Sequence, residues 1–138
     1  MTSTTTPSAG TFTFKDWQET VVAGDEGGAR LARATVVNAL SGAIEATATT
    51  CLYAISYAAD GTGSFSGFQR CEGAVDGRAG TFTLREWGTF GERGRVNCSF
   101  EVVAGSGTGE LTGLRGTGDY VAEPGQSAIS YSFDRSLD

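Results

Sequence analysis

Histidine is absent from this chain of 138 residues, and lysine occurs once, as Lys15. Without histidine, Ser-His-Asp and Cys-His nucleophile arrangements are excluded, as is a zinc or haem site with an imidazole ligand. Cysteine is also scarce: Cys51, Cys71 and Cys98 lack the pair spacing of metal sites, and an odd number does not complete a disulfide framework. We therefore expect no metal, no cofactor and a reducing, cytoplasmic setting.

Positive charge is scarce as well. The chain has 10 Lys and Arg against 16 Asp and Glu, which gives a net charge of −6. Because nucleic acids and anionic membranes are bound through basic patches, we expect neither as a partner. The sequence also lacks a run of about 18 apolar residues, the length that a membrane-spanning helix needs.

Glycine, by contrast, is abundant, with 21 residues against two prolines, and six glycines fall within Gly105–Gly118. This segment resembles a phosphate-binding loop, but such a loop needs a lysine beside its last glycine, and a dinucleotide fingerprint needs a helix directly behind it. Here the strand-like run Asp119-Tyr-Val-Ala follows instead. The glycines rather predict positive φ angles and close approach between barrel strands, with one helical turn around Glu110 to Leu114.

Short runs of β-branched and aromatic residues, separated by glycine-rich turns, predict eight strands. The strongest hairpin signal is the two-residue turn Asp76-Gly77. Residues 1–9 are expected to form a flexible tail, and residues 10–138 a single domain. The expected strands cover residues 10–23, 29–37, 43–58, 63–75, 78–90, 95–104, 117–122 and 128–135.

Eight strands with short turns and no long helix leave a β-sandwich or a closed barrel as candidates. The recurring glycines favour the barrel, because they relieve the corners where its strands bend sharply. We therefore predict an all-β fold, a single eight-stranded antiparallel β-barrel with the shape of a calycin or lipocalin. Such a barrel has room inside for side chains or for one small ligand.

Four segments carry a resemblance to a known family: Trp17-Gln-Glu19, Gly67–Phe82, Gly88-Thr89 and Val102–Gly118. They resemble the bacterial domain-of-unknown-function family 3224, whose known members have the allene oxide cyclase-like barrel. Proteins that share this barrel include cyclases of reactive oxylipins, dirigent proteins and natural-product cyclases, so the resemblance implies a shaped apolar cavity. The chain departs from the family pattern, which usually has glutamate at the position of Gln69 and histidine at the position of Glu86.

Strand alternation places side chains from two neighbouring strands on the inward face of the barrel. The first strand presents Phe65, Gly67, Gln69 and Cys71, and the second presents Phe82, Leu84 and Glu86. Gln69 and Glu86 are therefore predicted to face one cavity. An apolar barrel raises the pKa of a carboxyl group toward neutrality, so Glu86 is the first catalytic candidate, with Gln69 beside it.

Each candidate residue has a structural alternative. Glu86 is expected either to transfer protons or simply to hydrogen-bond Gln69 or pair with an arginine. Glu19 is either a second catalytic acid or a solvated strand end. The candidates for substrate contact otherwise serve core packing, and they are Trp17, Tyr53, Phe65, Cys71, Phe82 and Phe100.

Three functions are compatible with these residues. The first is a cyclase or isomerase that folds a small, hydrophobic, natural-product-like substrate inside the barrel, where holding the reacting ends together lowers the barrier. The second is a carrier that binds a small hydrophobic molecule without turnover. The third is a structural domain whose interior is filled by its own side chains. A homodimer is left open as the oligomeric state.

Overall fold

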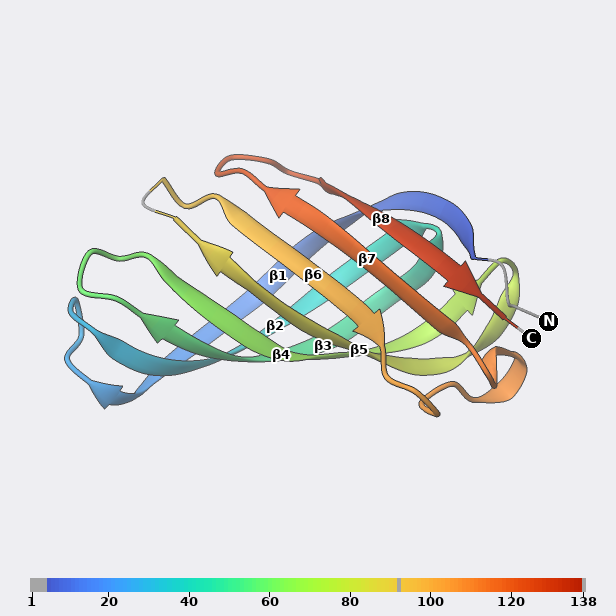
Figure 1. Ribbon diagram of the computed structural model, residues 1–138, viewed down its shortest axis with the longest axis horizontal. Coiled ribbons are helices and arrows are strands. Elements are labelled where there is room, and N and C mark those ends of the chain that lie inside the picture. Colours follow the sequence, from blue (N-terminus) through green and yellow to red (C-terminus); the bar gives the residue numbers. More distant parts are fainter. Residues whose placement is uncertain (1–4, 92, 138) are drawn as a thin grey trace.

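The computed structural model describes residues 5–91 and 93–137 and shows a closed barrel of eight antiparallel strands (Figure 1). Each strand pairs with its neighbours in sequence, and β1 closes the barrel against β8. The elements are β1 (Thr6–Gly24), β2 (Arg30–Gly42), β3 (Ile44–Tyr57), β4 (Gly63–Val75), β5 (Arg78–Phe90), β6 (Val96–Val102), the 3-10 turn η1 (Gly109–Leu111), β7 (Arg115–Ala122) and β8 (Ile129–Ser136).

The predicted all-β barrel is confirmed, and β4 and β5 have the predicted bounds. The predicted start of the first strand is wrong, because β1 begins at Thr6 and pairs with β8 from Thr6 to Phe12. Residues 6–9 of the predicted tail therefore belong to the barrel, and residues 1–4 lie outside the described residues. β2 continues five residues beyond the predicted end at Val37, because β1 and β3 both pair with this weakly β-forming stretch.

Two irregularities change which residues face inward. The β1–β2 register shifts between Lys15 and Gln18, where Asp16 has a φ of 60°. The β3–β4 register shifts between Glu45 and Thr50. A bulge adds a residue to one strand, so the inward face moves from even to odd positions on β1 and β3. The β1 bulge turns Glu19 toward the barrel mouth, and the β3 bulge buries Thr49.

The glycine-rich β6–β7 connection closes one end of the barrel, beside the termini (Figure 1). Leu111 of η1 and Leu114 are fully buried there, and Thr108 donates its backbone N–H to the carbonyl of Thr81 at 2.9 Å. At the end of the same glycine-rich run, a Cβ atom on Gly118 of β7 would collide with the carbonyl oxygen of Ser132 on β8. The predicted close approach is therefore confirmed, and η1 overlaps the predicted helical turn at Glu110 and Leu111.

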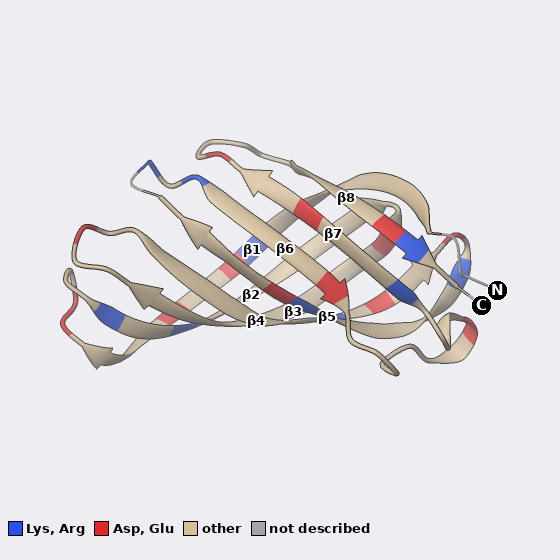
Figure 2. Ribbon diagram, in the orientation of Figure 1, with Lys and Arg blue, Asp and Glu red and all other residues tan. Residues whose placement is uncertain are grey.

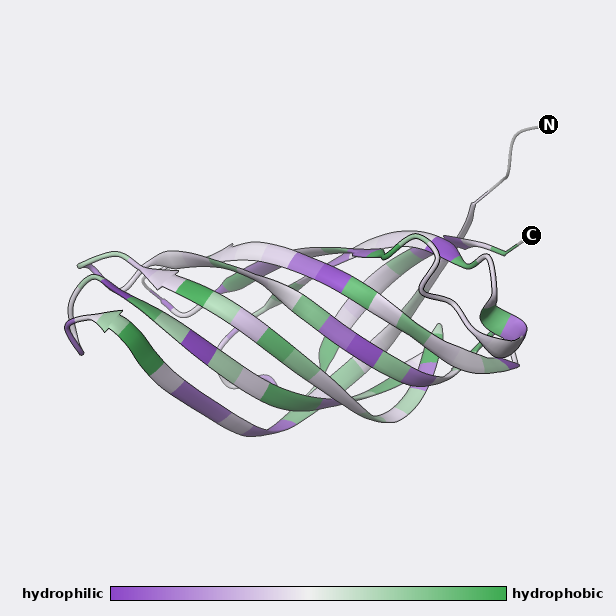
Figure 3. Ribbon diagram, turned by 90° about the horizontal axis from the view of Figure 1, so that it is seen from below, coloured by the Kyte–Doolittle hydropathy of each residue, from purple (hydrophilic) through white to green (hydrophobic). Residues whose placement is uncertain are grey.

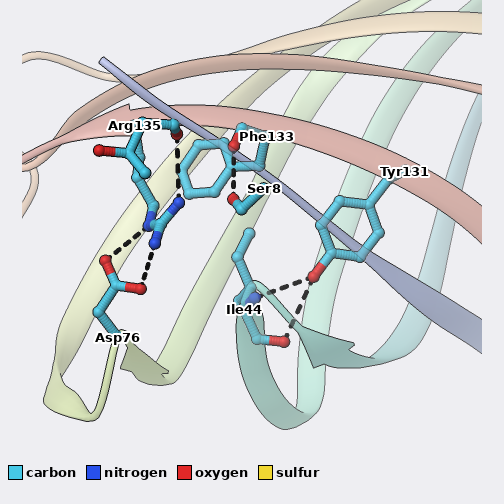
Figure 4. A network of polar contacts seen from close by, with 7 residues as sticks. Ser8, Ile44, Asp76, Tyr131, Phe133 and Arg135 are labelled. Carbon is cyan, nitrogen blue, oxygen red and sulfur yellow. Dashed lines mark hydrogen bonds and ion pairs between the residues drawn. The ribbon is translucent and has the colours of Figure 1, made fainter. Parts of the chain in front are cut away.

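Polar contacts fasten the closed end across the barrel (Figure 4). Arg135 of β8 forms a bidentate ion pair with Asp76, in the β4–β5 turn, and lowers the pKa of Asp76 through these hydrogen bonds. Tyr131 accepts a hydrogen bond from the backbone N–H of Ile44 at 2.9 Å and donates to the carbonyl of Ser41 at 3.0 Å. These contacts join β8 to the β2–β3 and β4–β5 hairpins.

The core divides into two clusters of buried apolar residues. The larger cluster fills the closed end and includes Ile44, Phe82 and Phe133, whereas the smaller one lies on β2 and β3 around Val36 and Ile55. Hydrophobic and hydrophilic residues alternate along the strands (Figure 3), as expected for strands with one face inside. Within residues 5–91 and 93–137, no helix has the length and apolar character that crossing a membrane requires.

Candidate functional site

The open half of the barrel contains a cavity of about 510 Å³. Its wall is formed mainly by apolar and aromatic side chains, among them Val36, Ile55, Phe65 and Phe90. Its mouth lies at the loops that join β3 to β4, β5 to β6 and β7 to β8, opposite the end that carries η1 (Figure 1). This volume lies within the range typical of small-molecule pockets.

A small void of about 10 Å³ lies beneath the cavity, which is room for about one water molecule. Phe12, Asn38 and Tyr120 line both spaces, so they form the floor that separates them. Glu86 and Gln69 line the void but not the cavity. The predicted acid therefore lies behind the cavity floor, not on the cavity wall.

Glu86 is 1% exposed, and both of its carboxyl oxygens have protein partners. Tyr53 donates its hydroxyl to Oε1 at 2.7 Å, and Gln69 donates its Nε2 to Oε2 at 2.6 Å. The Cys98 thiol lies 3.9 Å from Oε1. Tyr53 also lines the cavity, so it is the residue that connects Glu86 to that space.

The Gln69 amide has a defined orientation. Its Oε1 accepts hydrogen bonds from the Thr49 hydroxyl at 2.6 Å and from Asn38 Nδ2 at 3.4 Å. With the oxygen toward these two partners, the amide nitrogen points at Glu86. Asn38 and Thr49 thus hold Gln69 as a donor to the carboxyl group.

Gly67 allows the contact between Tyr53 and Glu86. These residues form one row across β3, β4 and β5, with Gly67 paired to Tyr53 on one side and to Glu86 on the other. A Cβ atom on Gly67 would lie 2.8 Å from Cδ1 of Tyr53. The missing side chain lets the Tyr53 ring lie over β4 and reach the neighbouring strand.

Burial raises the pKa of Glu86 above its ordinary value, and the hydrogen bonds from Tyr53, Gln69 and Cys98 oppose that rise. Burial also raises the pKa of Tyr53, an effect to which the nearby Glu86 charge adds. The pKa of Cys51 is raised to about 12 by burial and by Glu86. The site therefore favours neutral thiols and phenols around a carboxyl group that is hard to ionise.

Replacement of Glu86 by glutamine tests this pKa. A carboxyl group whose pKa is higher in the folded state makes the fold most stable while it is protonated, and that stability is lost as the pH rises through the folded pKa. We expect wild-type stability to fall relative to Glu86→Gln as the pH rises above the ordinary range of a glutamate pKa, measured by urea denaturation. The exposed control Glu26→Gln should show no such divergence, and a parallel profile for Glu86→Gln would contradict the raised pKa.

The structure separates the remaining predicted site residues into three places. Trp17, Tyr53 and Phe65 line the cavity. Glu19 is exposed at the mouth, where it accepts hydrogen bonds from Trp17 Nε1 at 3.1 Å and from the Tyr57 hydroxyl at 2.6 Å. The other three predicted contacts do not line the cavity but belong to the packed core: Cys71, Phe82 and Phe100.

Sequence reasoning missed Asn38, Thr49 and Tyr120 as members of the site. Asn38 lies beyond the predicted end of the second strand, so it carried no assigned face. Thr49 faces inward only because of the β3 bulge. Tyr120 could have been found, since it lies in a predicted strand, two residues after Gly118 and therefore on the same face.

The fold and the site define a closed eight-stranded barrel with an apolar cavity over a buried carboxyl network. The chain belongs to a family described as protein of unknown function (DUF3224), whose model matches residues 8–134. It is similar to the crystal structure of a DUF3224-family protein of unknown function from Shewanella oneidensis MR-1, with 28% identity and a TM-score of 0.80. That similarity covers 97% of this chain and 98% of the other. No curated protein matches the chain.

Proposed function

We propose that this protein binds a small hydrophobic molecule in the barrel cavity and promotes its isomerisation or ring closure. The observation that carries the proposal is the position of Tyr53, which lines the apolar cavity and hydrogen-bonds the buried Glu86 at 2.7 Å. An apolar pocket with a few fixed polar groups at one end binds and orients a ligand. Holding a flexible chain with its reacting ends together lowers the barrier by up to about 7–11 kcal/mol.

Glu86 acts on the ligand through Tyr53. When Glu86 is neutral, its Oε1–H donates to the Tyr53 oxygen, and the Tyr53 O–H turns toward a ligand carbonyl. As charge develops on that carbonyl oxygen, the Tyr53 proton moves to it and the Glu86 proton moves to Tyr53. The reverse transfer restores both groups after the rearrangement, so the cycle consumes no proton. The raised pKa of Glu86 favours its protonated form, which is the form that this transfer needs.

A carrier without turnover is the second candidate, and one observation favours it. Both Glu86 oxygens are occupied by protein donors, and Glu86 does not line the cavity. Such a network serves equally to stabilise the middle of the barrel. Mass spectrometry of the purified protein, followed by incubation with the released compound, separates the two functions, because an unchanged compound supports the carrier.

The cavity itself is tested by filling it. Ala122 lines the cavity near its mouth, so Ala122→Trp should weaken binding of the neutral dye N-phenyl-1-naphthylamine at least about tenfold, as measured by its fluorescence. The matched control is Ala54→Trp, because Ala54 is exposed on the outside of β3. Equal binding by both variants and the wild type, or no binding by the wild type, would contradict the proposal.

A reducing, cytoplasmic setting is part of the same proposal. Its support is that Cys51, Cys71 and Cys98 are all buried free thiols. Disulfides are rare in reducing compartments, where thiols of this kind persist.

A further inference from the structure

Few charged side chains face the cavity, although several surround its mouth. Among the described residues that line it, none is lysine or arginine, and Glu123 is the one with a charge. The loops at the mouth carry both signs (Figure 2), and two of the nearby cations have partners. Arg95 pairs with Glu123 at 3.2 Å, and Arg30 lies over the Tyr57 ring while donating to the carbonyl of Gly28 at 2.9 Å.

The inner end of the cavity offers hydrogen bonds instead of a counter-charge. Asn38 has both a donor and an acceptor in its amide, and Tyr53 and Tyr120 each have a hydroxyl. Behind this floor, the void is lined by Glu86, an acidic side chain, and by no lysine or arginine among the described residues. A carboxylate bound at the floor would lose its hydration without gaining a cation, whereas a carbonyl, amide or hydroxyl would lose little.

We propose that the cavity takes uncharged ligands and rejects carboxylates. Each ligand has a hydrophobic body in the apolar wall and a carbonyl, amide or hydroxyl head that contacts Asn38, Tyr53 and Tyr120 at the inner end of the cavity. This inference rests on the proposed function and narrows its substrate class. The ligand is then a neutral ketone, amide or alcohol, and free fatty acids in their ionised form are excluded.

A cationic head is disfavoured by the same geometry. An ammonium group needs acceptors on several sides, and the Glu86 oxygens that would attract it already accept from Tyr53 and Gln69 behind the floor. At the mouth, Glu19 accepts from Trp17 and Tyr57. Because Glu86 does not line the cavity, an amine at the inner end would lose its hydration without direct contact with a carboxylate.

Displacement of N-phenyl-1-naphthylamine from the wild-type protein at neutral pH tests the selectivity. The competitors share one chain length and differ in the head: decanamide, methyl octyl ketone, decyl alcohol, decylamine and decanoate. We expect the amide, ketone and alcohol to displace the dye at least about tenfold more strongly than decanoate or decylamine. If decanoate or decylamine competes as well as the amide, the selectivity is overturned while the proposed cavity stands. If the dye itself does not bind, the proposed function fails first.

Two matched tyrosine variants locate the head group. Tyr120→Phe removes a hydroxyl at the floor, and Tyr57→Phe removes one at the mouth, where it is bound to Glu19. Decanamide should bind Tyr120→Phe several-fold more weakly than the wild type, whereas Tyr57→Phe should keep the wild-type preference. A loss confined to Tyr57→Phe would place the head at the mouth and overturn the proposal.

Discussion

Replacing Gln69 by leucine is expected to destabilise the barrel by about 3 kcal/mol, because it removes the Nε2 donor from a buried carboxyl group. Glu86 is 1% exposed, so water cannot replace that donor freely. The Thr49 hydroxyl is less affected, since it keeps the carbonyl of Asn38 at 3.2 Å as an acceptor. Urea denaturation at neutral pH measures the loss, and Gln18→Leu on the exposed part of β1 serves as the control, with a change within about 0.5 kcal/mol.

The double variant Gln69→Leu/Glu86→Leu separates a polar network from simple packing. Removing one side chain leaves the other buried without its hydrogen-bond partner, whereas removing both leaves no unsatisfied polar group. We therefore expect the double variant to be more stable than the sum of the two single losses predicts, by about 1–2 kcal/mol. Additive losses would mean that Gln69 and Glu86 contribute to stability independently, contrary to the 2.6 Å contact between them.

Replacing Leu111 by alanine should cost about 2–5 kcal/mol, because it leaves a cavity in the part of the glycine-rich connection that plugs the barrel. Leu111 is 0% exposed and packs in the larger core cluster. Leu31→Ala is the matched control, since Leu31 is 53% exposed on β2 and should lose no more than about 0.5 kcal/mol. Chemical denaturation provides the measurement for both.

Ligand binding by Leu111→Ala tests whether packing at the closed end affects the cavity at the other end of the barrel. The plug lies at the closed end and the cavity opens at the other, so Leu111→Ala should leave the affinity for N-phenyl-1-naphthylamine unchanged in the folded protein. Equal stability losses in Leu111→Ala and Leu31→Ala would contradict the role of η1 as a packed plug.

The β4–β5 hairpin shows how far local sequence information reaches. Asp76-Gly77 fixes a two-residue turn with both residues at positive φ, and strand alternation then assigns every side chain of the hairpin to a face. That reasoning placed Gln69 and Glu86 inside, where the structure has them. This prediction used only the alternation of adjacent residues and the position of one turn.

The same reasoning does not predict which way side chains near a bulge point. Parity along β1 and β3 changes where the register shifts, and a bulge leaves little trace in a sequence rich in Thr and Ala. Thr49 and Glu19 therefore face directions that an unbroken alternation does not assign. The prediction of the cavity wall failed for a similar reason, because Phe82 and Phe100 face inward but lie at the plugged end.

The sequence by itself determined the β4–β5 strand pair, the barrel class and the inward faces of β4 and β5, because turns and alternation are local properties of the chain. Only the tertiary structure decided that Tyr53 stands across Gly67 from Glu86, since this depends on the registers of three strands. It also decided that Glu86 lies behind the cavity floor. Depth along a closed barrel is set by strand stagger and by the plug, and neither is encoded in the pattern of any single strand.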